Sequence, residues 1–191
     1  MQDPLTEAKL QFFITQAKLL TPYLEKYQTE KPMLVFMSDD LETILKTIMK
    51  KYMKKDLVQE ASSYKLTQLD FKKDVNLVPT KNVDIGFAVK QQLDKKKNIS
   101  QLQLLEFKTE CKTFLQGITE KLIERSPLKY SLVRNLSCLS PKLIAEDPEK
   151  AKTRFEKVLD KMLECRRLNA DECDTTKQQF DGLVTEIQVQ I

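Results

Sequence analysis

One long stretch with apolar positions at helical spacing lies between Ser100 and Arg125. Ser100 and Gln103 have the spacing of a capping box, in which each side chain satisfies a free backbone donor of the first turn. Proline disfavours helical geometry in the residue before it, so Ser126-Pro127 ends the pattern. We predict one helix of roughly 39 Å, along which shorter helices pack. Its apolar face comprises Leu104, Phe107, Cys111, Phe114, Leu115, Ile118 and Leu122.

Two more helices are predicted in the first part of the chain. Residues 5–27 form one, with Pro22 as a kink or a boundary between two helices. The apolar run 33–37 would suit a short strand or a buried linker, and we favour the linker because one strand would have no partner. The second helix runs from 38 or 39 to about 55, with Asp39 and Glu42 as its capping pair. The expected buried sides are Leu10, Phe13, Ile14, Ala17, Leu20 and Leu24, then Leu41, Ile44, Leu45, Ile48, Met49, Tyr52 and Met53.

The remaining segments alternate short helices with connections. We expect one short helix and a turn in 57–69, a loop in 71–82, and a short helix capped by Asp84 that ends in Lys95, Lys96 and Lys97. Further helices start at Pro127, at Asp147-Pro148 and at Asn169, which Glu172 completes as a capping pair. The sequence therefore predicts an all-α fold, an irregular bundle of about eight helices around the helix 100–125, in a single domain 1–191.

Composition supports this fold class and removes most catalytic schemes. Only 3 glycines and 7 prolines with 31% charged residues is typical of helices joined by short connections. The chain has no histidine, so catalytic schemes and metal sites that depend on imidazole are excluded. The three glycines are far apart and form no phosphate-binding loop. We expect no enzyme and no cofactor.

Cysteines and carboxylates suggest no metal site. Cys111, Cys138, Cys165 and Cys173 form no CxxC pair, and we expect each to be a small buried apolar residue. The acidic groups at 39–40 and 171–174 could in principle hold a divalent cation. They fall at predicted helix starts, where carboxylates are favoured anyway, so we predict no metal ligand there.

Basic residues offer the candidate binding site. The net charge is only +4, which permits contact with nucleic acid without requiring it. Clusters of lysine and arginine on helix exteriors are usually solvated surface, and at certain spacings they can bind phosphates. The tentative nucleic-acid-binding residues are Lys95, Lys96, Lys97, Arg125, Lys129 and Arg134.

The sequence gives no sign of a membrane protein. The start Met-Gln-Asp-Pro has no basic segment followed by an apolar core, and the longest apolar run, 33–37, is far too short to cross a bilayer. We expect the protein in the nucleus or the cytoplasm.

Several strings resemble animal proteins derived from hAT-superfamily DNA transposases, in the same order and over nearly the whole chain. They are KLQFF at 9–13, YLEKYQTEKPM at 23–33, DLE at 40–42, VDIGF at 83–87, ERSPLKYSLVR at 124–134 and SCLSP at 137–141. In such transposases a large all-helical insertion interrupts a ribonuclease-H-like catalytic domain that uses three carboxylates with divalent metal. This chain resembles that insertion.

The chain also departs from the family pattern. It lacks the Cys-x-x-His motif and the two aspartates expected before this region, and the glutamate of a Val-Glu-Arg-Gly-Phe-Ser-like string expected after it. No catalytic residue is carried over. The resemblance implies a non-catalytic helical remnant or fragment, a scaffold with weak, sequence-tolerant contact to double-stranded DNA. The alternative is a helical interaction module that docks a protein partner or another copy of itself through exposed apolar surface.

Overall fold

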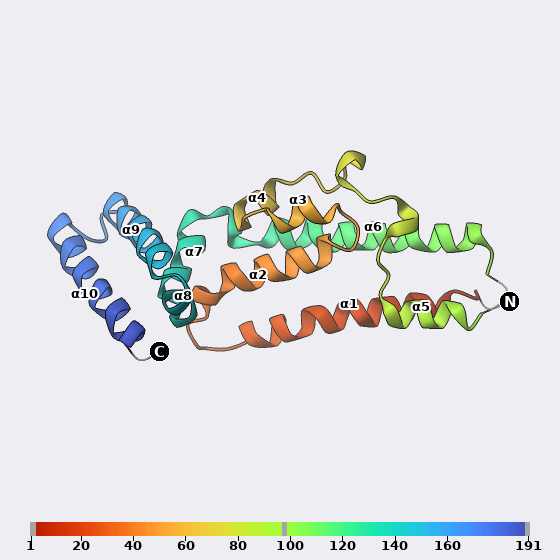
Figure 1. Ribbon diagram of the computed structural model, residues 1–191, viewed down its shortest axis with the longest axis horizontal. Helices are drawn as coiled ribbons and strands as arrows, with labels where there is room; N and C mark the ends of the chain where they lie inside the picture. The colour runs from red at the N-terminus through yellow and green to blue at the C-terminus, as the bar shows by residue number, and fades with distance from the viewer. Residues whose placement is uncertain (1–2, 97–98, 190–191) are drawn as a thin grey trace. The chain divides into compact units, whose positions relative to one another are not determined.

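The computed structural model describes residues 3–96 and 99–189 (Figure 1). These residues form ten α-helices and four 3-10 helices, and one isolated antiparallel bridge, Met53 to Leu77, is their only β pairing. The all-α prediction is confirmed. There are more helices than expected because two segments with one predicted helix each contain two: Lys55–Gln59 and Ser63–Gln68 in the first, Ser131–Asn135 and Pro141–Glu146 in the segment after Pro127.

The chain divides into two compact units, although the sequence suggests one domain. The first comprises Met1–Thr29 and Glu42–Ser126, and the second comprises Glu30–Leu41 and Pro127–Ile191. We call them unit 1 and unit 2 and describe each by itself.

Unit 1 is built around the long helix α6, which lies beside α1 and the second half of α2 (Figure 1). Its core includes the fully buried side chains of Leu45, Ile48, Tyr52, Phe107 and Leu115. The elements of this part of the chain are α1 (Thr6–Tyr27), α2 (Leu34–Met49), α3 (Lys55–Gln59), α4 (Ser63–Gln68), η1 (Asp74–Asn76), η2 (Thr80–Asn82), α5 (Phe87–Asp94) and α6 (Gln101–Arg125).

Unit 2 packs α9 and α10 against the short elements that follow Pro127. The rings of Phe155 and Phe180 stack with centroids 3.9 Å apart. Cys138 and Ile144 are buried in the same cluster. The elements are η3 (Pro127–Lys129), α7 (Ser131–Asn135), η4 (Leu136–Leu139), α8 (Pro141–Glu146), α9 (Pro148–Glu164) and α10 (Ala170–Val189).

Three helix starts follow the predicted capping chemistry. Ser100 and Gln103 form the complete capping box of α6, with backbone-to-side-chain distances of 2.9 and 3.2 Å. The Asp147 carboxylate accepts from the Lys150 N–H at 3.0 Å and caps α9. Asn169 and Glu172 exchange bonds of 2.8 and 2.9 Å at the start of α10.

The predicted buried side of α1 is wrong. Helix α1 runs through Pro22 without a break and buries Ala8, Phe12 and Gln16, together with its N-cap residue Leu5. These residues also recur at helical spacing, so α1 carries two stripes, and tertiary contacts select one of them. The other stripe stays outside: Leu10 is 57%, Phe13 56%, Ile14 42% and Leu24 54% exposed.

The predicted start of α2 is also wrong. The run 33–37 is not a linker, because α2 begins at Leu34, so Asp39 lies inside the helix and does not cap it. The carboxylate of Glu42 instead pairs with Lys46 at 2.8 Å and accepts from the Ser63 hydroxyl. The predicted buried stripe from Leu41 to Met53 is confirmed throughout.

Helix α5 begins later than predicted. Its N-cap is Gly86 with φ of +87°, a conformation that residues with a Cβ rarely adopt. Asp84 lies two residues earlier, and its carboxylate accepts from the Gly86 N–H at 3.0 Å.

None of the helices in the described residues is long and apolar enough to cross a membrane.

Candidate nucleic-acid interface

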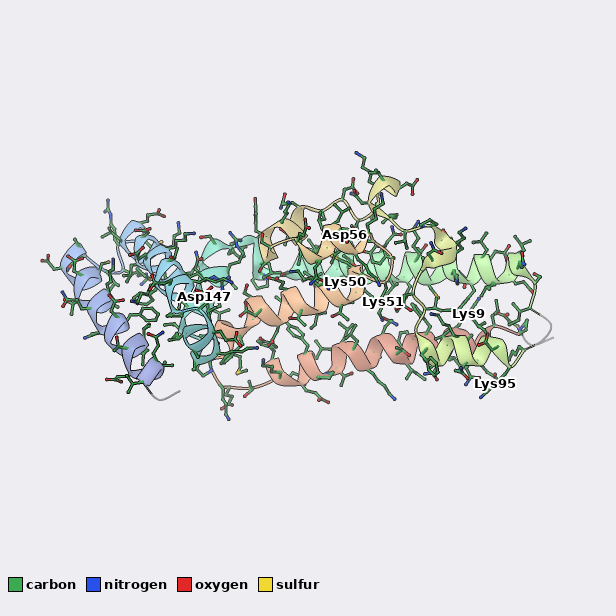
Figure 2. The ribbon with its side chains drawn as sticks, viewed as in Figure 1. Lys9, Lys50, Lys51, Asp56, Lys95 and Asp147 are labelled. Atoms are coloured by element: carbon green, nitrogen blue, oxygen red, sulfur yellow. The ribbon has the colours of Figure 1, made fainter. Side chains whose placement is uncertain are left out.

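Two of the three predicted lysines after α5 are described, and they differ in their surroundings. Lys95 follows the last residue of α5 and is exposed (Figure 2). The Lys96 ammonium lies 3.0 Å from a Glu7 carboxylate oxygen and donates to the Pro4 carbonyl at 2.8 Å. Lys97 lies outside the described residues. Lys96 is therefore engaged within unit 1, and Lys95 remains open to solvent.

The three arginine and lysine residues of the second predicted group are divided between the two units. Arg125 is the last residue of α6 in unit 1, whereas Lys129 and Arg134 are in unit 2. The Lys129 ammonium lies 5.1 Å from the centre of the Tyr130 ring. The Arg134 guanidinium donates to the Leu128 carbonyl, so it holds the turn before α7. Within unit 2, the Lys129 ammonium is therefore more accessible to a ligand than the Arg134 guanidinium.

A different set of lysines converges on a pocket of unit 1, with a volume of about 340 Å³. Five segments contribute to its walls: the turn that follows α2, α3, η2 with residues 78–84, α5 and α6. Among the described residues, Asp84 is the only acidic one that lines it. Its lysines are Lys50, Lys51, Lys55, Lys81, Lys90 and Lys108, and we call it the lysine pocket.

Backbone pairing fixes the turn that carries Lys50 and Lys51. The Lys51 carbonyl accepts from the Asp84 N–H at 2.8 Å, and the Tyr52 carbonyl accepts from the Val78 N–H at 3.0 Å. Tyr52 and Met53 are fully buried directly after the two lysines and anchor the turn in the core. The loop 76–84 is therefore held against the end of α2, which places Lys81 and Asp84 at the pocket that Lys50 and Lys51 line.

Several of the pocket ammonium groups are bound to neutral oxygen atoms. Lys51 donates to the side-chain carbonyl of Gln16 at 2.7 Å, and Lys50 donates to that of Gln59. Lys108 donates to the backbone carbonyl of Lys81. These bonds orient the ammonium groups and leave their charges uncompensated.

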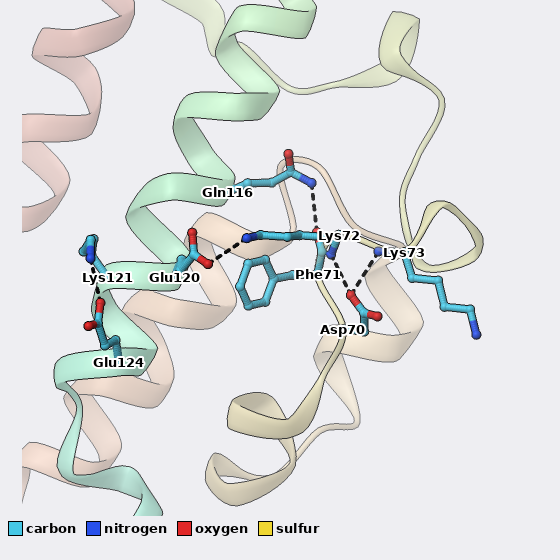
Figure 3. A network of polar contacts seen from close by, with 8 residues as sticks. All are labelled: Asp70, Phe71, Lys72, Lys73, Gln116, Glu120, Lys121 and Glu124. Atoms are coloured by element: carbon cyan, nitrogen blue, oxygen red, sulfur yellow. Dashed lines mark hydrogen bonds and ion pairs between the residues drawn. The ribbon is translucent and has the colours of Figure 1, made fainter.

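Several lysines elsewhere on unit 1 are paired with carboxylates. Lys72 lies 2.7 Å from Glu120 and Lys121 lies 2.7 Å from Glu124, as Figure 3 shows. Among the described residues that line the pocket, only the loose pair of Lys90 and Asp84 at 4.0 Å joins opposite charges. Within the described part of the chain, the lysine pocket therefore brings six ammonium groups together with a single carboxylate, that of Asp84.

Lys51 is the most desolvated of these cations. Burial lowers its pKa below the usual 10.5, and the negative charge of Asp84 counteracts only part of this effect. A half-buried ammonium that is bonded to a neutral amide is stabilised by an anion that enters the pocket, because charges interact more strongly where water is scarce.

The described residues give no support to other chemistry. They contain no group of three or more His, Cys, Asp or Glu side chains that could hold a metal ion. Asp171 and Glu172 lie in the first turn of α10, where carboxylates complement the free backbone donors. Cys111 and Cys138 are buried as expected, but Cys165 is exposed, so the prediction of a buried role is wrong for that residue.

Comparison with known proteins adds no identification. No protein-family model, no curated protein and no solved structure matches the chain. The resemblance to transposase-derived proteins stays a prediction from the sequence.

Proposed function

We propose that this chain is a non-catalytic helical module of the hAT-transposase type, and that unit 1 binds the phosphate backbone of double-stranded DNA without reading its sequence. The observation that carries the proposal is the lysine pocket, where six lysines face one aspartate among the described residues. The overall charge of +4 alone would not distinguish this surface from any other.

The chemistry of lysine suits this role. Duplex DNA carries one negative charge per about 1.7 Å of helix axis, and lysines that neutralise phosphates release condensed counterions. A lysine ammonium is a point charge, so it binds phosphate without the planar two-bond geometry by which arginine reads guanine. Contact of this kind tolerates any DNA sequence.

The transposase-like strings support the same assignment, since the helical insertion of a full transposase can lie near DNA. The 191 residues contain no histidine and none of the family's catalytic strings, so the role that we propose for this helical region is that of a scaffold. Of the two expected locations, nucleus or cytoplasm, we propose the nucleus, since the proposed ligand is duplex DNA.

The test measures binding of the full chain to two short duplexes of unrelated sequence, by fluorescence anisotropy over a range of salt concentrations. We expect similar affinities for both sequences and a steep loss between about 50 and 200 mM salt. Undetectable binding at about 50 mM salt, where phosphate contacts are strong, would contradict the proposal.

A second candidate function rests on the exposed stripe of α1. Leu10, Phe13, Ala17, Leu20 and Leu24 follow one another at steps of three and four residues, the spacing of a coiled-coil seam. Leu10 is 57%, Phe13 56% and Leu24 54% exposed, although the Phe13 ring also makes an edge-to-face contact with the Phe114 ring of α6, with centroids 6.0 Å apart. We propose that a second copy of α1 covers the seam, since a heptad seam matches a helix with the same spacing.

Sedimentation at increasing protein concentration tests this second function. We expect a dimer that the double variant Leu10→Lys/Leu24→Lys dissociates, because both side chains are exposed and their replacement leaves the core intact. The control is Val75→Lys/Leu102→Lys, which changes two other exposed apolar residues of unit 1. A monomer at every concentration would refute the dimer.

A further inference from the structure

We propose that the lysine pocket receives a phosphomonoester, the terminal phosphate of a DNA strand, in preference to an internal phosphodiester. This inference rests on the proposed DNA binding and specifies which part of the DNA enters the pocket.

The shape of the site is the first reason. Its volume of about 340 Å³ lies at the lower end of the range of small-ligand pockets, about 300–1,000 Å³. A continuous duplex is a wide, convex rod that can touch only the rim of such a hollow. A strand end presents a single projecting phosphate, which the pocket can surround.

The charge of the ligand is the second reason. A terminal phosphate carries about 1.5 to 2 negative charges near neutral pH and three strong acceptor oxygens, whereas an internal phosphodiester carries one charge. The ammonium groups of Lys50 and Lys51 each have three N–H donors, and each makes one hydrogen bond to a neutral amide oxygen. Donors therefore remain for a ligand with more than one charged oxygen.

The arrangement of inner and outer lysines is the third reason. Lys51 is half-buried, whereas Lys55, Lys81 and Lys90 are exposed. We call these three the rim lysines. Lys51 is placed to contact a group that enters the pocket, and the rim lysines are placed to contact the strand that continues outside. The two sets should respond differently to a change at the strand end.

The experiment compares one short duplex with 5′-phosphate ends, the same duplex with 5′-hydroxyl ends, and closed circular DNA as a competitor. We expect the phosphorylated duplex to bind about tenfold more tightly, the effect of one charge-assisted hydrogen bond or a little less. Closed circles should compete poorly per nucleotide. A free nucleoside monophosphate should compete with the phosphorylated duplex more weakly than that duplex itself, because it lacks the strand that reaches the rim.

Two variants separate this inference from DNA binding itself. Lys51→Gln should remove the advantage of the phosphate end, so that the phosphate-ended and hydroxyl-ended duplexes bind the variant with the same affinity. The triple variant Lys55→Gln/Lys81→Gln/Lys90→Gln should weaken both duplexes by a similar factor. Equal binding of both ends by the wild-type protein, with closed circles competing fully, would overturn the inference and leave the proposed function standing. Absence of any DNA binding by the wild-type protein would overturn both.

Discussion

The Tyr52 hydroxyl donates a hydrogen bond to the Thr119 hydroxyl over 2.9 Å in the interior of unit 1. Thr119 in turn donates to the Leu115 carbonyl at 2.9 Å, so the pair links the turn after α2 to α6. Burial raises the pKa of Tyr52 and keeps the phenol protonated. Tyr52 directly follows Lys51, and this bond therefore anchors the turn that carries Lys50 and Lys51.

Replacing Thr119 by valine should destabilise the protein. The shape of the side chain is kept, but the buried Tyr52 hydroxyl loses its acceptor, which costs about 1–3 kcal/mol of unfolding free energy. The double variant Tyr52→Phe/Thr119→Val should recover most of that loss, because no hydroxyl is then left unpaired. Urea denaturation measures both variants. Equal stability of Thr119→Val and the wild type would show that the bond contributes nothing.

Lys51 should make stability depend on pH in the alkaline range. Because folding lowers its pKa below 10.5, the unfolded state binds more protons in the window between the lowered pKa and 10.5. The stability contributed by this residue therefore rises as the pH rises through that window. Below the window the full cost of burying the charge is present.

The variant Lys51→Gln isolates this effect, since glutamine does not titrate. Relative to the variant, the wild-type protein should gain stability as the pH approaches 10.5. Other groups that titrate in this range cancel in the comparison. A difference that stays constant with pH would mean that Lys51 is not desolvated in the folded protein.

The cysteines should differ strongly in reactivity. Burial raises the pKa of Cys111 to about 12 and that of Cys138 to about 11, and a thiol reacts as its thiolate. Cys165 is exposed and Cys173 is half-buried. Brief alkylation of the native protein followed by peptide mass analysis should label Cys165 first and leave Cys111 and Cys138 unlabelled until denaturant is added. Early labelling of Cys111 would contradict the packing of α6.

Local signals in the sequence predict the helix starts well. Ser100 and Asn169 each form a capping pair with a side chain three residues on, and Asp147 is a capping residue followed by Pro148, so these residues identify the starts of α6, α10 and α9 without any tertiary information. The start of α2 at Leu34 carries no such signal in the run that precedes it, and the capping-like pair Asp39 and Glu42 lies inside the helix.

Features that depend on tertiary contacts cannot be predicted from the sequence pattern alone. Helix α1 carries two apolar stripes, and only its packing decides that Phe12 is buried while Leu10 is exposed. The lysine pocket gathers residues from Lys50 to Lys108, whose approach depends on the pairing of the Asp84 N–H with the Lys51 carbonyl. Lys50, Lys51 and Lys55 are visible as a basic cluster in the sequence, but the loop and helices that complete the site are not.

The most direct test of phosphate binding at the lysine pocket compares two triple variants of equal charge. One replaces the rim lysines by glutamine, and the other replaces Lys18, Lys65 and Lys73, three lysines of unit 1 outside the pocket. The salt dependence of duplex binding should become shallower in the rim variant, by about 0.9 in the log–log slope for each phosphate that is no longer neutralised. The control variant should stay close to the wild type. Equally weakened affinity in both variants would contradict the account, because binding would then follow net charge and not the pocket.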